Sequence, residues 1–188
     1  VATKLGLIDD IAFMVLEETV RSIDRIGSAF GRDCTVSINI AATQAGDERF
    51  MREFVSQLEG TGFARRMIVE VTEEAFLAKD TFQERILPMI REIGARVSID
   101  DFGTGYSSLS ALAGITADEL KIDRAFITDV HLRPRSQNVL KAIEALGHSL
   151  GMQIVVEGVE TIDELTYLRT HTQIPLAQGH YFARPMLL

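Results

Sequence analysis

Polar side chains follow five short apolar runs of this sequence, at the position where each run ends. Carboxylate and amide oxygens are the ligands that Mg²⁺ and Mn²⁺ prefer, and a lysine can offset negative charge. If the runs are parallel strands, their carboxyl ends meet at one rim, so we expect the polar groups to form a single site. The groups are Asn39 after residues 36–38, Glu70 after 67–69, Asp100 and Asp101 after 97–99, Lys121 after 119–120 and Glu157 after 154–156.

Carboxylates gathered at one rim would repel one another, and without a counter-ion some of them would take up protons. A divalent metal removes this repulsion. The adjacent Asp100 and Asp101 could let one carboxylate bridge two ions while the other binds a single ion. Two such ions can activate a water and stabilise the oxyanions of a phosphoester under in-line attack. Lys121 could orient that water or offset the developing negative charge.

Length, composition and charge exclude several classes of protein. The 188 residues are 46% hydrophobic, enough for the core of one domain. No apolar run approaches the ~20 residues of a membrane helix, and no signal peptide pattern is present. The net charge of -8 argues against binding a nucleic-acid polymer through a basic face, although a bound cation would still allow phosphate ligands.

One cysteine, Cys34, suits a reducing compartment, so we expect a cytoplasmic segment without membrane contact. The chain begins at Val1 rather than Met, and we therefore expect it to be cut from a longer polypeptide, which could itself be anchored in a membrane.

Hydrophobic periodicity predicts alternating helices and strands. Such alternation is typical of a parallel sheet with helices packed outside it, in a single domain over residues 1–188. Helices are expected over 10–30, 50–58, 82–93, 107–112, 139–150 and 162–168. Strands are expected over 35–40, 67–71, 95–99, 119–122 and 153–156, with a sixth at 180–182.

Two architectures fit this alternation, an open doubly wound sheet and a (β/α) barrel. Polar groups at nearly every strand end favour the barrel, because an open sheet concentrates its site at one switch point. A complete barrel has eight strands and typically ~250 residues. The sequence therefore predicts a modified TIM-like (β/α) barrel that is incomplete at its N-terminus, with the missing part before Val1.

Single motifs also have simpler interpretations. An acidic residue after a strand is more often a helix cap, and Asp100-Asp101 could cap a following helix. Gly103-Thr104-Gly105 could be a phosphate loop, but Ser108 replaces the third glycine, so a loop at the rim is favoured. Asp101-Phe102-Gly103 matches a kinase triplet that no other kinase motif accompanies. The convergence of several polar strand ends still favours a metal site.

Six segments carry a more specific pattern. They are Ser-Ile-Asn-Ile (37–40), Glu-Val-Thr-Glu (70–73), Asp-Asp-Phe-Gly-Thr-Gly-Tyr-Ser-Ser-Leu (100–109), Leu-Lys-Ile-Asp (120–123), Glu-Gly-Val-Glu-Thr (157–161) and Ala-Gln-Gly-His-Tyr-Phe-Ala-Arg-Pro (177–185). In type and order they resemble the signatures of the EAL-domain family of bacterial cyclic di-GMP phosphodiesterases. The resemblance implies a modified TIM barrel that hydrolyses cyclic di-GMP to linear pGpG with two Mg²⁺ or Mn²⁺ ions. It also implies a homodimer and attached sensor or regulatory domains.

The resemblance assigns roles to the residues around the expected site. Lys121 would contact or help to deprotonate the nucleophilic water, Glu157 would hold metal-bound water, and Gln178 would lie at the substrate and water site. The metal ligands would be Asn39, Glu70, Asp100 and Asp101, with Asp100 between the two ions.

Further residues would support this site. Asp123 and Gly179 would support the rim and the substrate. Glu73 would anchor a loop that couples the site to a dimer interface, and this loop includes Phe102, Gly103, Thr104 and Gly105.

The Glu-Ala-Leu triplet that names the family, and the arginine shortly after it, are absent from the start of the sequence, where the resemblance places them. Gly6-Leu7-Ile8 resembles the segment that follows them, so we expect these 188 residues alone to hold an incomplete metal site. The first alternative is a catalytically inactive EAL-like receptor for cyclic di-GMP. Because every ligand that the chain covers is retained, the enzyme is favoured. The second alternative is an enolase-type Mg²⁺ barrel, which also combines rim carboxylates with a lysine.

Overall fold

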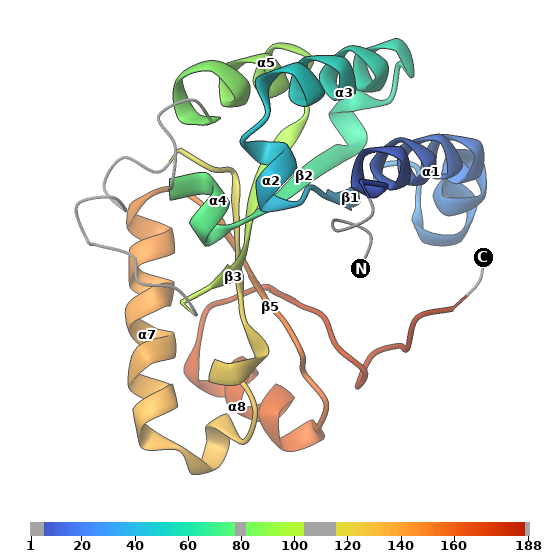
Figure 1. Cartoon of the computed structure of the whole chain (residues 1–188). Coiled ribbons are helices and arrows are strands. Elements are labelled where there is room, and N and C mark those ends of the chain that lie inside the picture. Colours follow the sequence, from blue (N-terminus) through green and yellow to red (C-terminus); the bar gives the residue numbers. More distant parts are fainter. Residues whose placement is uncertain (1–5, 78–81, 104–115, 187–188) are drawn as a thin grey trace. The chain divides into compact units, whose positions relative to one another are not determined.

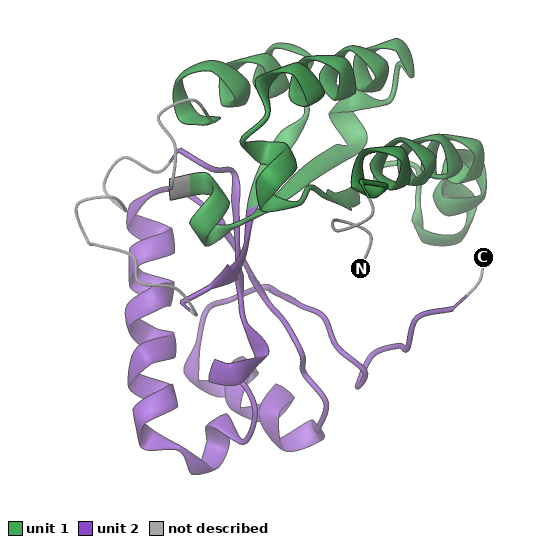
Figure 2. Cartoon of the chain, viewed as in Figure 1, with its two compact units in different colours: residues 1–98, 188 green, residues 99–187 purple. Residues whose placement is uncertain are grey.

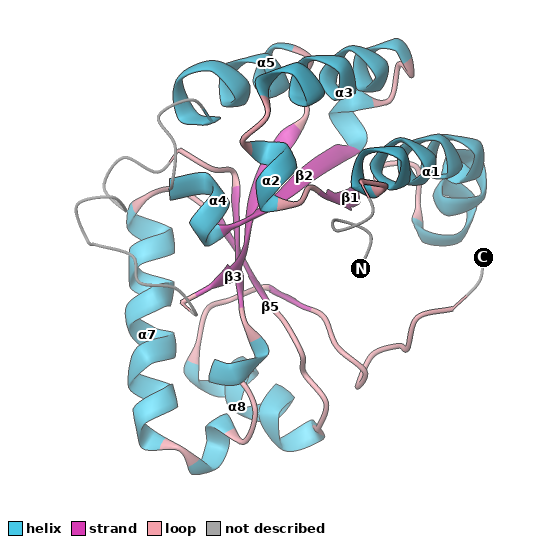
Figure 3. Cartoon of the chain, in the orientation of Figure 1, coloured by secondary structure: helices cyan, strands magenta, loops and turns pink. Residues whose placement is uncertain are grey.

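Helices and strands alternate along the chain (Figures 1 and 3). The structure is a computed structural model that describes residues 6–77, 82–103 and 116–186. It divides into a first unit, residues 1–98 and 188, and a second unit, residues 99–187 (Figure 2). Strand β3 (Arg96–Phe102) runs from one unit into the next, and the strands are hydrogen-bonded in sequence order, β1 to β6.

The first unit contains a parallel pair of strands, β1 (Val36–Asn39) and β2 (Met67–Thr72), with Asn39 opposite Glu70. Its longer helices are α1 (Ile8–Phe30) and α3 (Glu48–Gly60). The shorter helical segments are α2 (Ala42–Ala45), η2 (Ala64–Arg66), α4 (Glu73–Leu77), η3 (Phe82–Ile86) and α5 (Leu87–Glu92).

Sequence features explain where these helices begin and end. The Asp47 carboxylate accepts the backbone N–H groups of Arg49 and Phe50 at 2.9 and 3.1 Å, which caps α3. Gly31 follows α1 with φ 100°, a conformation that favours glycine and ends the helix where the sequence predicts. The apolar face of α3, formed by Phe50, Met51, Phe54, Val55 and Leu58, is buried.

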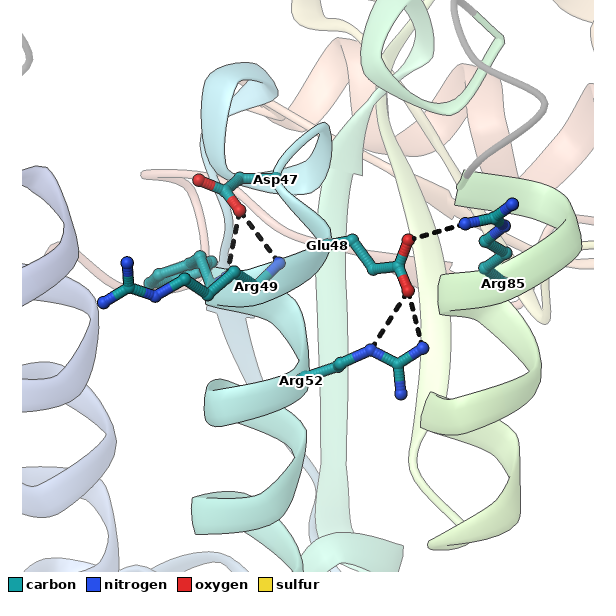
Figure 4. Close-up of polar contacts among 6 residues, drawn as sticks. Asp47, Glu48, Arg49, Arg52 and Arg85 are labelled. Carbon is teal, nitrogen blue, oxygen red and sulfur yellow. Dashed lines mark hydrogen bonds and ion pairs between the residues drawn. The ribbon is translucent and has the colours of Figure 1, made fainter.

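Glu48 joins α3 to η3 on the surface of the first unit (Figure 4). Its carboxylate lies 2.5 Å from an Arg52 guanidinium nitrogen and 3.0 Å from one of Arg85. The hydrogen bonds from Arg52 and then Arg85 lower the pKa of Glu48. Because both arginines are exposed, solvent screens these pairs and they contribute little to the fold.

The second unit contains three further parallel strands, β4 (Glu119–Ile122), β5 (Gln153–Val156) and β6 (Leu176–Ala177). The helix α7 (Pro134–Ser149) separates β4 from β5, and α8 (Ile162–His171) separates β5 from β6. Two short helical segments, η4 (Arg124–Phe126) and η5 (Val130–Leu132), follow β4. Thr161 caps α8, which begins where the sequence predicts a helix over residues 162–168.

The prediction of a sixth strand at residues 180–182 is wrong. The last described strand is Leu176–Ala177, and the chain turns immediately after it. The Tyr181 N–H donates to the Val159 carbonyl at 3.0 Å, and the Phe182 N–H donates to the Gly179 carbonyl at 3.1 Å. These two hydrogen bonds, one to Val159 and one within the turn, replace the strand pairing that the aromatic residues suggest. The helix predicted over residues 107–112 lies outside the described residues.

Among the described residues, no helix has both the length and the apolar composition needed to cross a bilayer.

Candidate active site

Three carboxylates of the second unit form a cluster. Asp100 and Asp101 lie at the end of β3, and Glu157 directly follows β5. One carboxylate oxygen from each lies within 4.8 Å of those from the other two. Asp101 has a left-handed backbone with φ 55°, and its N–H donates to the Asp100 carboxylate at 3.1 Å. Aspartate tolerates this conformation better than most residues, so the turn can place two successive carboxylates in one cluster.

Lys121 supplies a positive charge to this cluster. Its Nζ lies 3.2 Å from Oδ1 of Asp100 and 2.5 Å from Oε1 of Glu157, and the residue is only 6% exposed. In the parallel register Lys121 lies opposite Val155, and Glu157 continues β5 on the same face as Val155. The Gln178 side chain also donates to Oε1 of Glu157, at 2.5 Å. One carboxylate oxygen of Glu157 thus contacts two other predicted site residues, Lys121 and Gln178.

Asp101 is surrounded by other negative charges, as the sequence implies. Partial desolvation raises the pKa of Asp101, and the neighbouring charges of Asp100 and Asp123 raise it further, while Lys121 opposes them. Ionising all of these carboxylates is therefore costly unless another cation is present. A set of hard oxygen donors with this need for positive charge suits Mg²⁺ or Mn²⁺.

The first unit contributes its own predicted residues. Asn39 ends β1, and Glu70 lies two residues before the end of β2. The two are register partners, so their backbones meet near the carboxyl end of this strand pair. Glu70 is 4% exposed, whereas Asn39 is exposed. Glu73 opens α4 and is also 4% exposed. Acidic side chains this deeply buried are paired or hydrogen-bonded in folded proteins, and both Glu70 and Glu73 have such interactions in the structure.

The predicted supporting residues lie around the cluster of the second unit. The Asp123 carboxylate accepts the Ala125 N–H at 2.8 Å and caps η4. Gly179 lies so close to the Val159 backbone that a Cβ there would collide with the Val159 nitrogen and oxygen. This contact explains why a glycine follows Gln178.

The described part of the predicted loop begins with a buried Phe102. Gly103 has φ 94°, and a Cβ on it would lie 2.8 Å from the Phe126 ring. Thr104 and Gly105 lie outside the described residues.

Two residues that the sequence reasoning missed hold the segment after β5. Glu164 accepts the N–H groups of Glu160 and Thr161 at 2.9 and 3.0 Å. Arg124 packs against Gly158, where a Cβ would collide with its side chain, and it lies 3.8 Å from Glu160. The T-x-x-E spacing of Thr161 and Glu164 is a capping-box signal that could have identified Glu164.

Comparisons with known proteins identify similar sequences and structures. The chain is 36% identical to the cyclic di-GMP phosphodiesterase PdeR of Escherichia coli (strain K12) over 98% of its own length, and it spans 28% of that protein. In structure it is similar to the PaMucR phosphodiesterase in its c-di-GMP complex, with a TM-score of 0.86 and 34% identity over 98% of this chain and 75% of the other.

A second solved structure adds a metal. The Klebsiella pneumoniae BlrP1 complex with manganese and cy-diGMP matches with a TM-score of 0.76 and 28% identity, over 90% of this chain and 44% of the other. The likeness to these structures confirms the predicted TIM-like (β/α) fold, incomplete relative to the family. The EAL domain model matches residues 1–185, which confirms the resemblance: the chain belongs to the EAL domain family.

Proposed function

We propose that the chain is the phosphodiesterase part of a signalling protein and hydrolyses cyclic di-GMP to linear pGpG. The observation that carries this proposal is the cluster in which Lys121 contacts both Asp100 and Glu157 beside Asp101. A similar protein of E. coli is named a cyclic di-GMP phosphodiesterase, and 98% of this chain matches part of that protein. The cluster around Lys121 and the similarity to this phosphodiesterase together favour hydrolysis of a phosphoester.

The proposed metal ligands are Asn39, Glu70, Asp100 and Asp101, with Asp100 between two ions of Mg²⁺ or Mn²⁺. Their hard oxygen donors fit these ions, and the crowding at Asp101 calls for additional positive charge. When bound, the ions would lower the pKa of water and neutralise charge on the phosphoester. The presence of manganese in the similar BlrP1 structure supports the choice of a divalent metal.

The protein's own side chains would orient and move protons. Lys121 would contact the attacking water and stabilise negative charge that develops on the phosphate. Glu157, held by Lys121 and Gln178, would orient water at the site. Gln178, Asp123 and Gly179 would position cyclic di-GMP.

The proposal extends to the surroundings of the site. Glu73 would anchor the loop that includes residues 102–105, and the loop would couple the site to a homodimer interface. We place the segment in the cytoplasm of a larger protein that carries sensor or regulatory domains, since the chain spans 28% of PdeR.

Incubation of the full-length protein with cyclic di-GMP and Mn²⁺, followed by chromatography, tests the proposal. Appearance of pGpG supports it, and Asp100→Asn should abolish turnover. The exposed Asp163→Asn removes one charge elsewhere in the same unit and should leave turnover unchanged. Binding of cyclic di-GMP without cleavage would instead indicate a receptor. If the protein does not bind cyclic di-GMP at all, both the enzyme and the receptor are contradicted, and this is the result expected of an enolase-type enzyme.

A further inference from the structure

Glu164 is a buried carboxylate with hydrogen bonds to two separate segments of the second unit. Only 3% of the residue is exposed. Its Oε1 accepts the N–H of Asp129 at 3.0 Å. Its Oε2 accepts the N–H groups of Glu160 and Thr161 at 2.9 and 3.0 Å. Both carboxylate oxygens are therefore engaged by backbone donors.

The two segments follow neighbouring strands that carry site residues. Asp129 lies after β4, the strand of Lys121, between η4 and η5. Glu160 and Thr161 lie after β5, in the loop that Glu157 opens. Since β4 and β5 pair directly, Glu164 links the segments that leave the sheet beside Lys121 and beside Glu157.

The loop of residues 157–161 has further ties to the same surroundings. The Val159 N–H donates to the Gln178 carbonyl at 3.1 Å, and the Tyr181 N–H donates to the Val159 carbonyl at 3.0 Å. Gly158 lies against Arg124 with φ 68°, too close for a Cβ. The loop is thus hydrogen-bonded to Gln178 at Val159 and to Glu164 at the two residues that follow.

The hydrogen bonds to Glu164 favour the ionised form of its carboxylate. Burial alone would raise the pKa of Glu164, but hydrogen bonds from the backbone of Glu160, Asp129 and Thr161 outweigh burial and lower it. Hydrogen bonds to an ionised carboxylate are roughly twice as strong as neutral ones. The bond to Asp129 also supports a residue in the left-handed region of backbone conformation, with φ 54°.

We propose that Glu164 is a positioning residue for the reaction: by joining the segments that follow β4 and β5, it fixes the Glu157 carboxylate relative to Lys121 and Gln178. Glu164 itself contacts neither metal ligands nor substrate in this assignment. The inference rests on the proposed function, because it names the residue that holds that site in place. A displaced Glu157 would reorient the water it holds, while the remaining contacts to cyclic di-GMP persist.

The full-length protein with Glu164→Gln tests this role, because glutamine keeps the shape but directs an amide donor at N–H groups that need an acceptor. We expect kcat to fall about 10- to 100-fold, as for other residues that orient catalytic groups. KM for cyclic di-GMP should change little, since an interaction with the transition state is lost rather than binding. The matched control is Asp163→Asn, an exposed acidic residue in the same first turn of α8, which should leave kcat unchanged.

Hydrogen exchange gives a readout that does not depend on activity. In Glu164→Gln we expect faster exchange not only at Asp129, Glu160 and Thr161 but also at Glu157 and Val159, whose amides donate to the Ile122 and Gln178 carbonyls rather than to Glu164. The Glu157 amide donates to the Ile122 carbonyl at 3.0 Å, so its exchange reports on the start of the loop. Unchanged exchange at Glu157 and Val159 would show that Glu164 only caps α8, and the inference would be wrong.

The remaining outcomes are also decisive. A wild-type kcat in Glu164→Gln, or an equal loss of kcat in Asp163→Asn, would overturn the positioning role. Glu164→Ala should repeat the loss of kcat more strongly, but if it fails to fold, the isosteric glutamine variant decides alone. A wild-type protein that does not cleave cyclic di-GMP would contradict the proposed function, and the exchange at Glu157 would then decide the positioning role separately.

Discussion

The Lys121 ammonium lies 2.5 Å from a carboxylate oxygen of Glu157, and the same nitrogen lies 3.2 Å from Asp100. One buried cation thus contacts carboxylates at the carboxyl ends of two different strands, β3 and β5. With Asp101 in the same cluster, negative charge still exceeds the positive charge of Lys121. This imbalance favours the entry of a divalent cation.

Replacement of this cation should impair catalysis while leaving the shape of the site intact. Lys121→Met keeps an unbranched chain of similar length at a position that is 6% exposed. We expect kcat to fall by about 10²–10³ with saturating Mn²⁺, a loss typical of one electrostatic contact to a transition state. Steady-state kinetics would measure it, with the exposed Lys141→Met on α7 as the control. Equal kcat values in the two variants would contradict a catalytic role for Lys121.

Divalent metal should stabilise the folded protein through the same carboxylates. A ligand that binds only the folded state at a concentration 100 times its Kd adds about 2.7 kcal/mol to the free energy of unfolding. We expect Mn²⁺ to raise the Tm in calorimetry and EDTA to reverse the rise. In Asp100→Asn the rise should be smaller, because the carboxylate proposed to lie between the ions is lost. A rise of the same size in this variant would remove Asp100 from the metal site.

The sequence predicts the β-strands of this fold well because each strand is a short apolar run that ends at a polar group. The ends of β1 and β5 agree with the predicted Asn39 and Glu157 positions to within one residue, and β2 ends two residues after Glu70. Residues 180–182 have the composition of a strand, since aromatic residues favour strands. Their turn depends on the close approach of Gly179 to Val159, a tertiary contact that no local pattern reveals.

The candidate site shows the same division between local and tertiary information. Residue types after strands indicate Asp100, Lys121 and Glu157, but the ion pairs that join them arise only when the strands are side by side. The capping box identifies the start of α8 from local sequence. The bond from Asp129 to Glu164 joins residues far apart along the chain, so the sequence pattern could not reveal that this cap also links two loops.

A side chain at position 179 should disturb the site through the backbone. In Gly179→Ala the new Cβ would collide with Val159 atoms that are themselves hydrogen-bonded to Gln178 and Tyr181. Overpacking of this kind costs about 1–3 kcal/mol. We expect a lower Tm and a lower kcat, because Gln178 would move away from Glu157.

Gly151→Ala is the matched control for this collision, since Gly151 has φ 71° but no atom within 4 Å of an added Cβ. It measures the backbone strain of a non-glycine residue without a clash. If both alanine variants lose the same free energy of unfolding and keep the same kcat, the packing of Gly179 against Val159 is not what holds Gln178 in place.

Acid should selectively remove the stabilisation that Glu164 provides. Backbone N–H donors outweigh burial and lower the folded-state pKa of Glu164 below its ordinary value of 4.5, which applies to the unfolded chain. Between these two pKa values the unfolded state binds more protons, so the contribution of Glu164 is fully present above pH 4.5 and is lost as the pH falls through the folded-state pKa. We therefore expect the difference in unfolding free energy between wild type and Glu164→Gln to be largest near neutral pH and to shrink in acid. Denaturant unfolding of both proteins across this range would measure it. A difference that stays constant would mean that the neutral carboxyl group serves equally well and that the charge of Glu164 does not hold the two segments.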